Sequence, residues 1–99
     1  MTSHVIEIAE IKVTDPAGFE AGVASARPHF IAAEGCLGLS LHRVIEAPNT
    51  YRLIVKWRTV EDHTVTFRGS EGFQHWRAAV ASFFAEPPVV THSRVVELD

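Results

Sequence analysis

The stretch from Trp57 to Trp76 reads W-R-T-V-E-D-H-T-V-T-F-R-G-S-E-G-F-Q-H-W, and in it an apolar strand gives way to helices. Thr59 is a suitable N-cap, and the acidic residues that follow it favour a helix start. Gly69 breaks this helix, and Ser70 can cap a second one. Large aromatic residues and histidines recur throughout, which is typical both of a pocket for a flat organic molecule and of a compact core.

Two strands and a short turn precede this stretch and predict a β-hairpin. Residues 37–46 alternate in polarity, and residues 47–50 form a turn. Residues 51–58 form the second strand, in which Tyr51 is expected at a rim or surface position beside the turn. The residues expected to share one face in the two strands are Leu37, Leu39, Leu41, Arg43 and Ile45, and Tyr51, Leu53, Val55 and Trp57.

The first third of the chain predicts a strand followed by a helix. Residues 5–13 have apolar side chains at both odd and even positions, interrupted by Glu7, Glu10 and Lys12, as in a strand covered on both faces. Asp15 and Pro16 suit the first positions of a helix. Pro28 should kink or restart that helix. Its apolar stripe is predicted to contain Phe19, Val23, Ala26 and Phe30.

Pro87 and Pro88 end the aromatic helix, and residues 89–98 predict the last strand. The order strand, helix, strand, strand, helix, strand predicts a ferredoxin-like α+β fold over residues 1–99, as a single domain. Its four-stranded antiparallel sheet has helices on one face. Because the first and last strands of the chain have apolar residues at both odd and even positions, we expect the other face to pack on a second copy, in a homodimer.

Composition excludes several classes of protein. The net charge of −3, with acids and bases interspersed, argues against a nucleic-acid-binding protein. No apolar run approaches the ~20 residues that a membrane-spanning helix needs. The first residues lack the pattern of a signal peptide, so we expect a cytoplasmic protein. The single cysteine, Cys36, excludes an intrachain disulfide and has no evident activating partner.

Motifs along nearly the whole chain resemble the antibiotic biosynthesis monooxygenase (ABM) family. They are D-P-A-G-F, G-C-L-G-L-S-L-H-R, P-N-T-Y-R-L-I-V-K-W, V-E-D-H, F-R-G-S-E-G-F-Q-H-W-R and F-F-A-E-P-P-V-V-T-H. The resemblance implies a dimeric α+β barrel, in which each subunit keeps a cavity between its sheet and helices. It also implies activities that range from cofactor-independent, quinone-forming monooxygenases to haem-degrading enzymes and signal-molecule isomerases.

Two positions separate this chain from the better defined branches of that family. Haem-degrading members have a tryptophan and a histidine at positions that resemble Phe67 and Arg77 here. Several quinol oxidases and the isomerases have a histidine at the position of Phe67. A phenylalanine cannot donate a hydrogen bond, accept one or bind a metal, so haem degradation is the less favoured activity.

His63 is the first candidate for a catalytic base, since histidine titrates near neutral pH. A hydrogen bond to backbone or to a carboxylate is the alternative role. His42 and His92 either face the cavity or make core or dimer contacts. Arg68 and Arg77 either hold a substrate anion or form salt bridges to Glu61, Asp62 or Glu71. We expect one of two places for Trp57, Phe67 and Trp76, either the wall of the cavity or the packed core.

These features favour a monooxygenase that needs no cofactor or metal and oxidises a small aromatic or polyphenolic molecule with O₂. Such an enzyme must remove a proton, stabilise the resulting anion and exclude water. The alternative is a non-catalytic dimer that binds a small hydrophobic molecule. The loss of a polar side chain at Phe67 motivates this second hypothesis.

Overall fold

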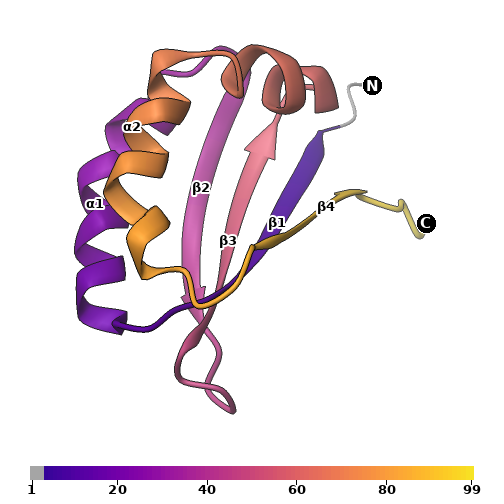
Figure 1. Cartoon of the computed structure of the whole chain (residues 1–99). Helices are drawn as coiled ribbons and strands as arrows, with labels where there is room; N and C mark the ends of the chain where they lie inside the picture. Colours follow the sequence, from indigo (N-terminus) through magenta and orange to yellow (C-terminus); the bar gives the residue numbers. More distant parts are fainter. Residues whose placement is uncertain (1–3) are drawn as a thin grey trace.

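The computed structural model describes residues 4–99 and shows a four-stranded antiparallel sheet with two helices packed on one face (Figure 1). The strands lie in the order β2-β3-β1-β4, which confirms the predicted ferredoxin-like topology. The elements are β1 (Val5–Lys12), α1 (Pro16–Ile31), β2 (Cys36–Arg43), β3 (Thr50–Trp57), the π-helix η1 (Asp62–Phe67), α2 (Glu71–Val80), the 3₁₀ turn η2 (Ala81–Phe83) and β4 (Val89–Arg94).

Helix α1 begins as predicted, because the Asp15 carboxylate accepts a hydrogen bond from the Gly18 amide at 3.2 Å and Pro16 follows directly. Its apolar stripe is buried in full, as expected. The predicted restart of the helix at Pro28 is wrong, since one helix continues through Pro28 to Ile31. Pro28 lies in the last turn, where little helix remains to be disturbed.

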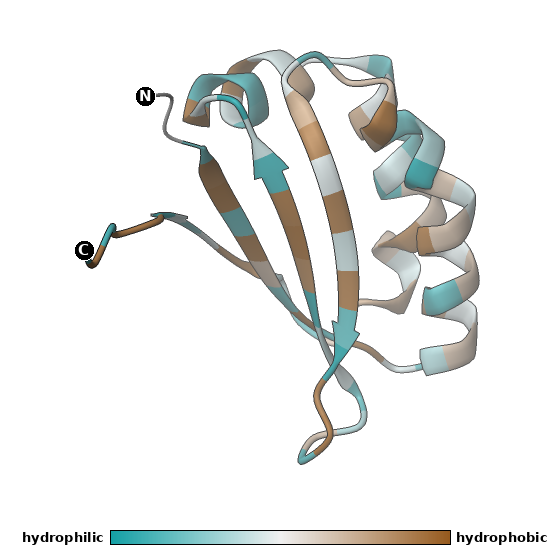
Figure 2. Cartoon of the chain, turned by 180° about the vertical axis from the view of Figure 1, so that it is seen from behind, coloured by the Kyte–Doolittle hydropathy of each residue, from teal (hydrophilic) through white to brown (hydrophobic). Residues whose placement is uncertain are grey.

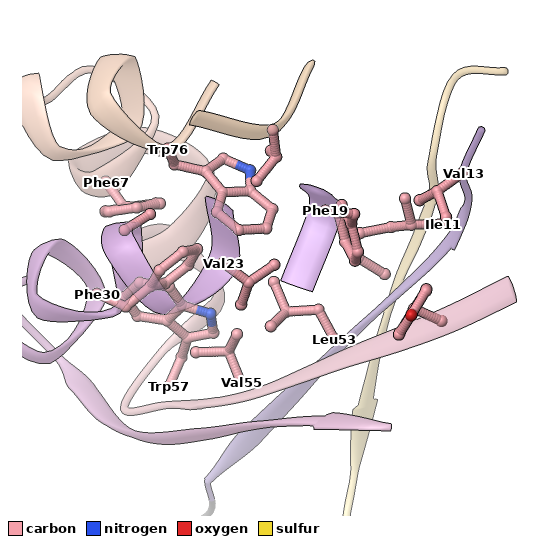
Figure 3. Packing of buried hydrophobic residues seen from close by; sticks show 14 of the residues in the cluster. Ile11, Val13, Phe19, Val23, Phe30, Leu53, Val55, Trp57, Phe67 and Trp76 are labelled. Carbon is pink, nitrogen blue, oxygen red and sulfur yellow. The ribbon is translucent and has the colours of Figure 1, made fainter. Parts of the chain in front are cut away.

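The core lies between the helices and the inward face of the sheet. Figure 3 shows Val55 and Trp57 of β3 beneath Phe30 of α1 and Phe67 of η1. All four inward side chains of β3 are buried, as the alternation predicted. This includes Tyr51, so the predicted rim position is wrong. Its hydroxyl donates a hydrogen bond to the Glu20 carboxylate, and burial of the phenol therefore leaves no unpaired polar group.

Strand β2 departs from the simple alternation. The register with β3 shifts between Cys36 and Gly38, so that Leu37 is the extra residue of a β-bulge. Leu37 is half exposed, and Ile45 lies beyond the strand and is almost fully exposed. Leu39 and Leu41 pack against the core. The predicted apolar face of this strand is therefore confirmed only at these two leucines.

The last strand is shorter than predicted. Strand β4 ends at Arg94, and the apolar side chains at Val95, Val96 and Leu98 beyond it are exposed. Repeated valine is compatible with a strand at any of these positions. However, β1 offers backbone partners to β4 only from Glu10 to Val5. Strand β4 therefore ends at Arg94 because its partner β1 begins at Val5, and not because of the type of residue that follows.

The sheet face away from the helices has a mixed character. Figure 2 shows hydrophobic and hydrophilic segments along β1 and β3, which belong to residues of both sheet faces. Ile8 and Ile54 are cross-strand neighbours on this face and are only partly buried. Arg52 and Glu10 form an ion pair at 3.4 Å beside them. Among residues 4–99, none of the helices has both the length and the apolarity needed to span a membrane.

Candidate active site

A cavity of about 310 Å³ lies between the inward sheet face and the helices. A volume of this size is at the lower end of the range of small-molecule sites. Aromatic side chains dominate the helical side of the wall, and aliphatic ones the sheet side. The apolar wall consists of Ala9, Ile11, Leu53 and Val90 from the sheet, with Phe30, Phe67, Phe73, Trp76, Phe84 and Pro88, and four polar residues complete it, namely Glu7, His63, Arg68 and Arg77.

Glu7 places a carboxyl group in this apolar surrounding. It shares the inward face of β1 with Ala9 and Ile11, and only 4% of its surface is exposed. The indole Nε1 of Trp57 donates a hydrogen bond to Glu7 Oε1 at 2.9 Å. Burial raises the pKa of Glu7 to about 7, although this hydrogen bond and the charge of Arg68 act in the opposite direction. The carboxyl group therefore titrates near neutral pH.

His63 lies beside Glu7 in the same wall. Its Nε2 is 3.4 Å from Glu7 Oε1, and its ring stacks on Trp57 with ring centroids 5.3 Å apart and an interplanar angle of 14°. Burial lowers the pKa of His63 to about 4, and the positive charges of Arg68 and His92 lower it further. At neutral pH the imidazole is uncharged, with one N–H donor and one acceptor nitrogen.

His92 extends this group to a third titratable side chain. It lies on β4 opposite Glu7 of β1, and its Nε2 is 2.8 Å from Nδ1 of His63. Burial and the charge of Arg68 lower its pKa as well. His92 is not in the wall of the main cavity. It lines a second hollow of about 130 Å³ together with Val5, Val60, Ser93 and Arg94.

The π-helix η1 positions His63. The Thr59 hydroxyl accepts a hydrogen bond from the Asp62 amide at 3.0 Å, so the predicted cap is confirmed. Arg58 binds both carboxylate oxygens of Asp62 at 3.0 Å and holds the pKa of that carboxyl below its usual value. Gly35 packs against Asp62 so closely that a Cβ atom would overlap the carboxylate. This clamp fixes the turn that aims His63 at Glu7.

Five of the residues singled out from the sequence line the cavity, namely His63, Phe67, Arg68, Trp76 and Arg77. Trp57 lies in the core and contacts the site through Glu7, His63 and Phe67. The side chain of His92 reaches the site through His63, and its backbone lies opposite Glu7 on the neighbouring strand. His42 is exposed on the opposite sheet face, where its Nε2 and the Ser40 hydroxyl form a hydrogen bond of 3.0 Å. The structure therefore does not bring His42 to the cavity, because the bulge and the strand pleat turn it outward.

The sequence reasoning missed Glu7, which it treated only as an interruption of an apolar strand. A sharper signal was available, since Glu7 has the same parity as Val5, Ala9 and Ile11. A carboxylate on the apolar side of a strand needs a buried partner. Its partner, Trp57, lies fifty positions further along the chain, beyond the reach of local patterns.

Among residues 4–99, no three histidine, cysteine, aspartate or glutamate side chains gather in a way that could hold a metal ion. The site instead combines a buried carboxyl group, an uncharged imidazole and two arginines around an aromatic hollow. Such a group of residues can take up a proton from a bound aromatic molecule and stabilise the anion that remains.

Comparison with known proteins agrees with this architecture. A proposed antibiotic biosynthesis monooxygenase of Bordetella bronchiseptica has a crystal structure that superimposes with a TM-score of 0.93. It is 52% identical, with 96% of this chain and 99% of that chain covered. The protein YczJ of Bacillus subtilis (strain 168), which is uncharacterised, is 38% identical over 74 residues, 75% of this chain and 78% of its own.

SnoaB of Streptomyces nogalater, a cofactor-independent oxygenase, has the same fold with a TM-score of 0.76. It is 19% identical, and the match covers 98% of this chain and 95% of that one. The sequence profile of the family described as "Antibiotic biosynthesis monooxygenase" matches residues 4–79, which include Glu7 and His63 but not His92. The chain therefore belongs to the antibiotic biosynthesis monooxygenase family.

Proposed function

We propose that this protein is a cofactor-independent monooxygenase that uses O₂ to oxidise a small aromatic or polyphenolic molecule to a quinone. The observation that supports this most is the carboxyl group of Glu7, which is buried in an aromatic cavity with a pKa of about 7. A base with a pKa near the working pH is what proton removal requires. SnoaB, a cofactor-independent oxygenase of the same fold, makes the activity chemically reasonable.

The reaction begins when the Glu7 carboxylate removes a proton from a substrate such as anthrone. The resulting anion transfers one electron to O₂, and the substrate radical and superoxide combine to form a carbon–oxygen bond. Glu7 then returns its proton to the peroxide. Loss of the remaining C–H proton and cleavage of the O–O bond release water and leave a carbonyl group. The substrate gains one oxygen atom, and the second oxygen atom leaves as water.

The other cavity residues have distinct roles in this scheme. The arginines Arg68 and Arg77 stabilise the substrate anion by their charge. Phe67, Phe73 and Trp76 provide flat apolar surface for the rings and exclude water. The base that the sequence suggested was His63. With a pKa of about 4, His63 holds a proton too weakly at neutral pH to act as the base. We therefore assign the role of base to Glu7, and we assign to His63 the role of passing the proton on.

An aerobic assay against a panel of anthrones and quinols tests this function. We expect oxygen consumption and quinone absorbance with at least one member. Replacing His63 with alanine should lower turnover by about 10²-fold or more, which is the usual contribution of a positioned acid–base group. The matched control is His75→Ala, which removes an exposed imidazole on α2. Equal rates for His63→Ala and wild type would refute the role of His63.

The non-catalytic alternative predicts a different result in the same panel. Ligands would raise the melting temperature without any consumption of oxygen, because binding to the folded state alone stabilises it. Turnover of any panel member would remove that alternative.

We also propose that the sheet face away from the helices packs on a second copy of the chain. Ile8 and Ile54 lie at the centre of this face, and exposed apolar residues follow β4 at its edge. Burying the apolar part of this surface would stabilise the dimer by about 25 cal/mol for each Å² removed from water. Ion-paired residues such as Arg52 would then surround an apolar centre.

Light scattering after size exclusion tests the dimer. We expect the mass of two chains for the wild type and of one chain for Ile8→Lys, because an unpaired charge at the centre of an apolar interface is costly. The matched control is Ala24→Lys, on the exposed side of α1, which should remain dimeric. A wild-type protein with the mass of one chain would contradict the proposal.

A further inference from the structure

Three titratable side chains connect two separate hollows. Glu7 and His63 line the main cavity, whereas His92 lines the smaller hollow together with Val5, Val60, Ser93 and Arg94. The links are 3.4 Å from Glu7 Oε1 to His63 Nε2 and 2.8 Å from His63 Nδ1 to His92 Nε2. His63 thus uses both of its ring nitrogens, one toward each neighbour.

This use of both nitrogens permits two arrangements of the hydrogen atoms. In the first, Nδ1–H of His63 donates to His92 Nε2, and Nε2 of His63 is free to accept a proton from Glu7. In the second, Nε2–H of His63 points to the Glu7 carboxylate, and Nδ1 accepts from His92. Moving one proton along each link converts the first arrangement into the second.

We propose that Glu7, His63 and His92 form a proton-conducting chain from the main cavity to the hollow beside Arg94, with His92 as its outer member. The inference rests on the proposed role of Glu7 as the base. A proton taken from the substrate passes from Glu7 to His63 Nε2, the proton on His63 Nδ1 passes to His92 Nε2, and His92 Nδ1 releases a proton to water. One proton enters and one leaves, and no residue gains net charge.

The surroundings favour this transfer over a fixed charge on either ring. Both histidine pKa values are lowered by burial and by Arg68, so each ring is uncharged at neutral pH and offers the donor and the acceptor that a hop needs. The link from Glu7 to His63 is longer than the ~2.7–3.2 Å of an ordinary hydrogen bond. Transfer there requires the two groups to approach by a few tenths of an ångström, and catalytic hydrogen bonds commonly shorten in this way when substrate binds.

The proton-conducting chain has a chemical use because the other polar groups in the cavity wall, Arg68 and Arg77, are already protonated and cannot take the proton from Glu7. Without an exit, a proton on Glu7 can only return to the same substrate molecule. With the chain, protons from the solvent replace it. Exchange of a substrate C–H with solvent deuterium therefore reports on the chain, and it does so without any oxygen chemistry.

The test is anaerobic exchange of the acidic C–H protons of anthrone in D₂O, followed by mass spectrometry. We expect wild-type protein to accelerate the exchange and His92→Ala to slow it by about 100-fold. Imidazole added to the solution should restore exchange in His92→Ala, since the hollow enlarged by the substitution can hold it. His42→Ala is the matched control, because it removes an exposed imidazole from the other sheet face.

The results distinguish a failure of the proton-conducting chain from a failure of Glu7 as the base. If His92→Ala exchanges as fast as wild type, or if imidazole fails to restore exchange in a variant whose melting temperature shows that it is folded, His92 does not conduct protons. If wild type itself accelerates no exchange while it still consumes oxygen with the same substrate, Glu7 is not the base, and the chain is refuted together with that assignment.

Discussion

Replacing Glu7 with glutamine should lower turnover by about 10²–10⁴-fold, the contribution of a positioned general base, and at the same time make the folded protein more stable. Glutamine keeps the shape of the side chain, and its carbonyl can still accept the hydrogen bond from Trp57 Nε1. It cannot take up a proton from the substrate. Opposite changes in activity and stability are typical of a functional group held in a costly environment.

The gain in stability depends on pH in a defined direction. Because the pKa of Glu7 is raised from 4.5 to about 7 on folding, its contribution to stability is complete below pH 4.5 and is lost as pH rises through 7. Above pH 7 the buried carboxylate costs about 3 kcal/mol. Chemical denaturation at pH 8 should therefore show Glu7→Gln to be more stable than wild type by up to that amount.

His63 has the opposite dependence, because its pKa falls from 6.5 to about 4 on folding. Its contribution is complete above pH 6.5 and is lost as pH falls through 4. The two slopes oppose each other in the wild type, whereas only the slope of His63 remains in Glu7→Gln. We therefore expect the stability of the variant to rise more steeply from pH 4 to 6.5. A variant less stable than wild type at pH 8 would contradict the assignment of the Glu7 pKa.

Replacing Trp57 with alanine should lower the free energy of unfolding by about 3–5 kcal/mol, the usual cost of removing a buried tryptophan. Trp57 has no exposed surface, stacks on His63 and packs against Phe67 with ring centroids 5.4 Å apart. A domain of this size has only about 5–15 kcal/mol in total. Urea denaturation, with the midpoint and slope fitted together, measures the loss.

The matched variant Trp57→Phe keeps an aromatic ring but removes the N–H group. Because the hydrogen bond from Trp57 lowers the pKa of Glu7, its loss should raise that pKa further. We expect a smaller loss of stability than for alanine, and a pH–rate profile whose ascending limb lies at higher pH. An unchanged profile would show that the indole N–H does not act on Glu7.

Local patterns were sufficient for the order of elements and for much of the core. The stripe from Phe19 to Phe30 and the inward face from Tyr51 to Trp57 follow from helical and strand periods alone, and both are buried. The patterns failed at Leu37, where a bulge inserts one residue, and at Val95, where the partner strand has already ended. Both errors concern pairing between strands, which no single segment encodes.

The site was predictable only in part, for a related reason. His63, Phe67, Arg68 and Trp76 lie close together in the chain, so a local motif identified their shared wall. Glu7 and His92 come from β1 and β4, which meet His63 only after the sheet has formed. The homodimer and the cytoplasmic location stay predictions, because the structure of one chain tests neither.

The most direct measurement is the titration of the Glu7 carboxyl group by carbon-13 NMR, with the signal assigned by its loss in Glu7→Gln. We predict a midpoint near pH 7 and a shift of that midpoint in Trp57→Phe. A midpoint near 4.5, the ordinary value for a glutamate, would show that the carboxyl group is not poised as a base, and it would contradict the proposed chemistry of the cavity.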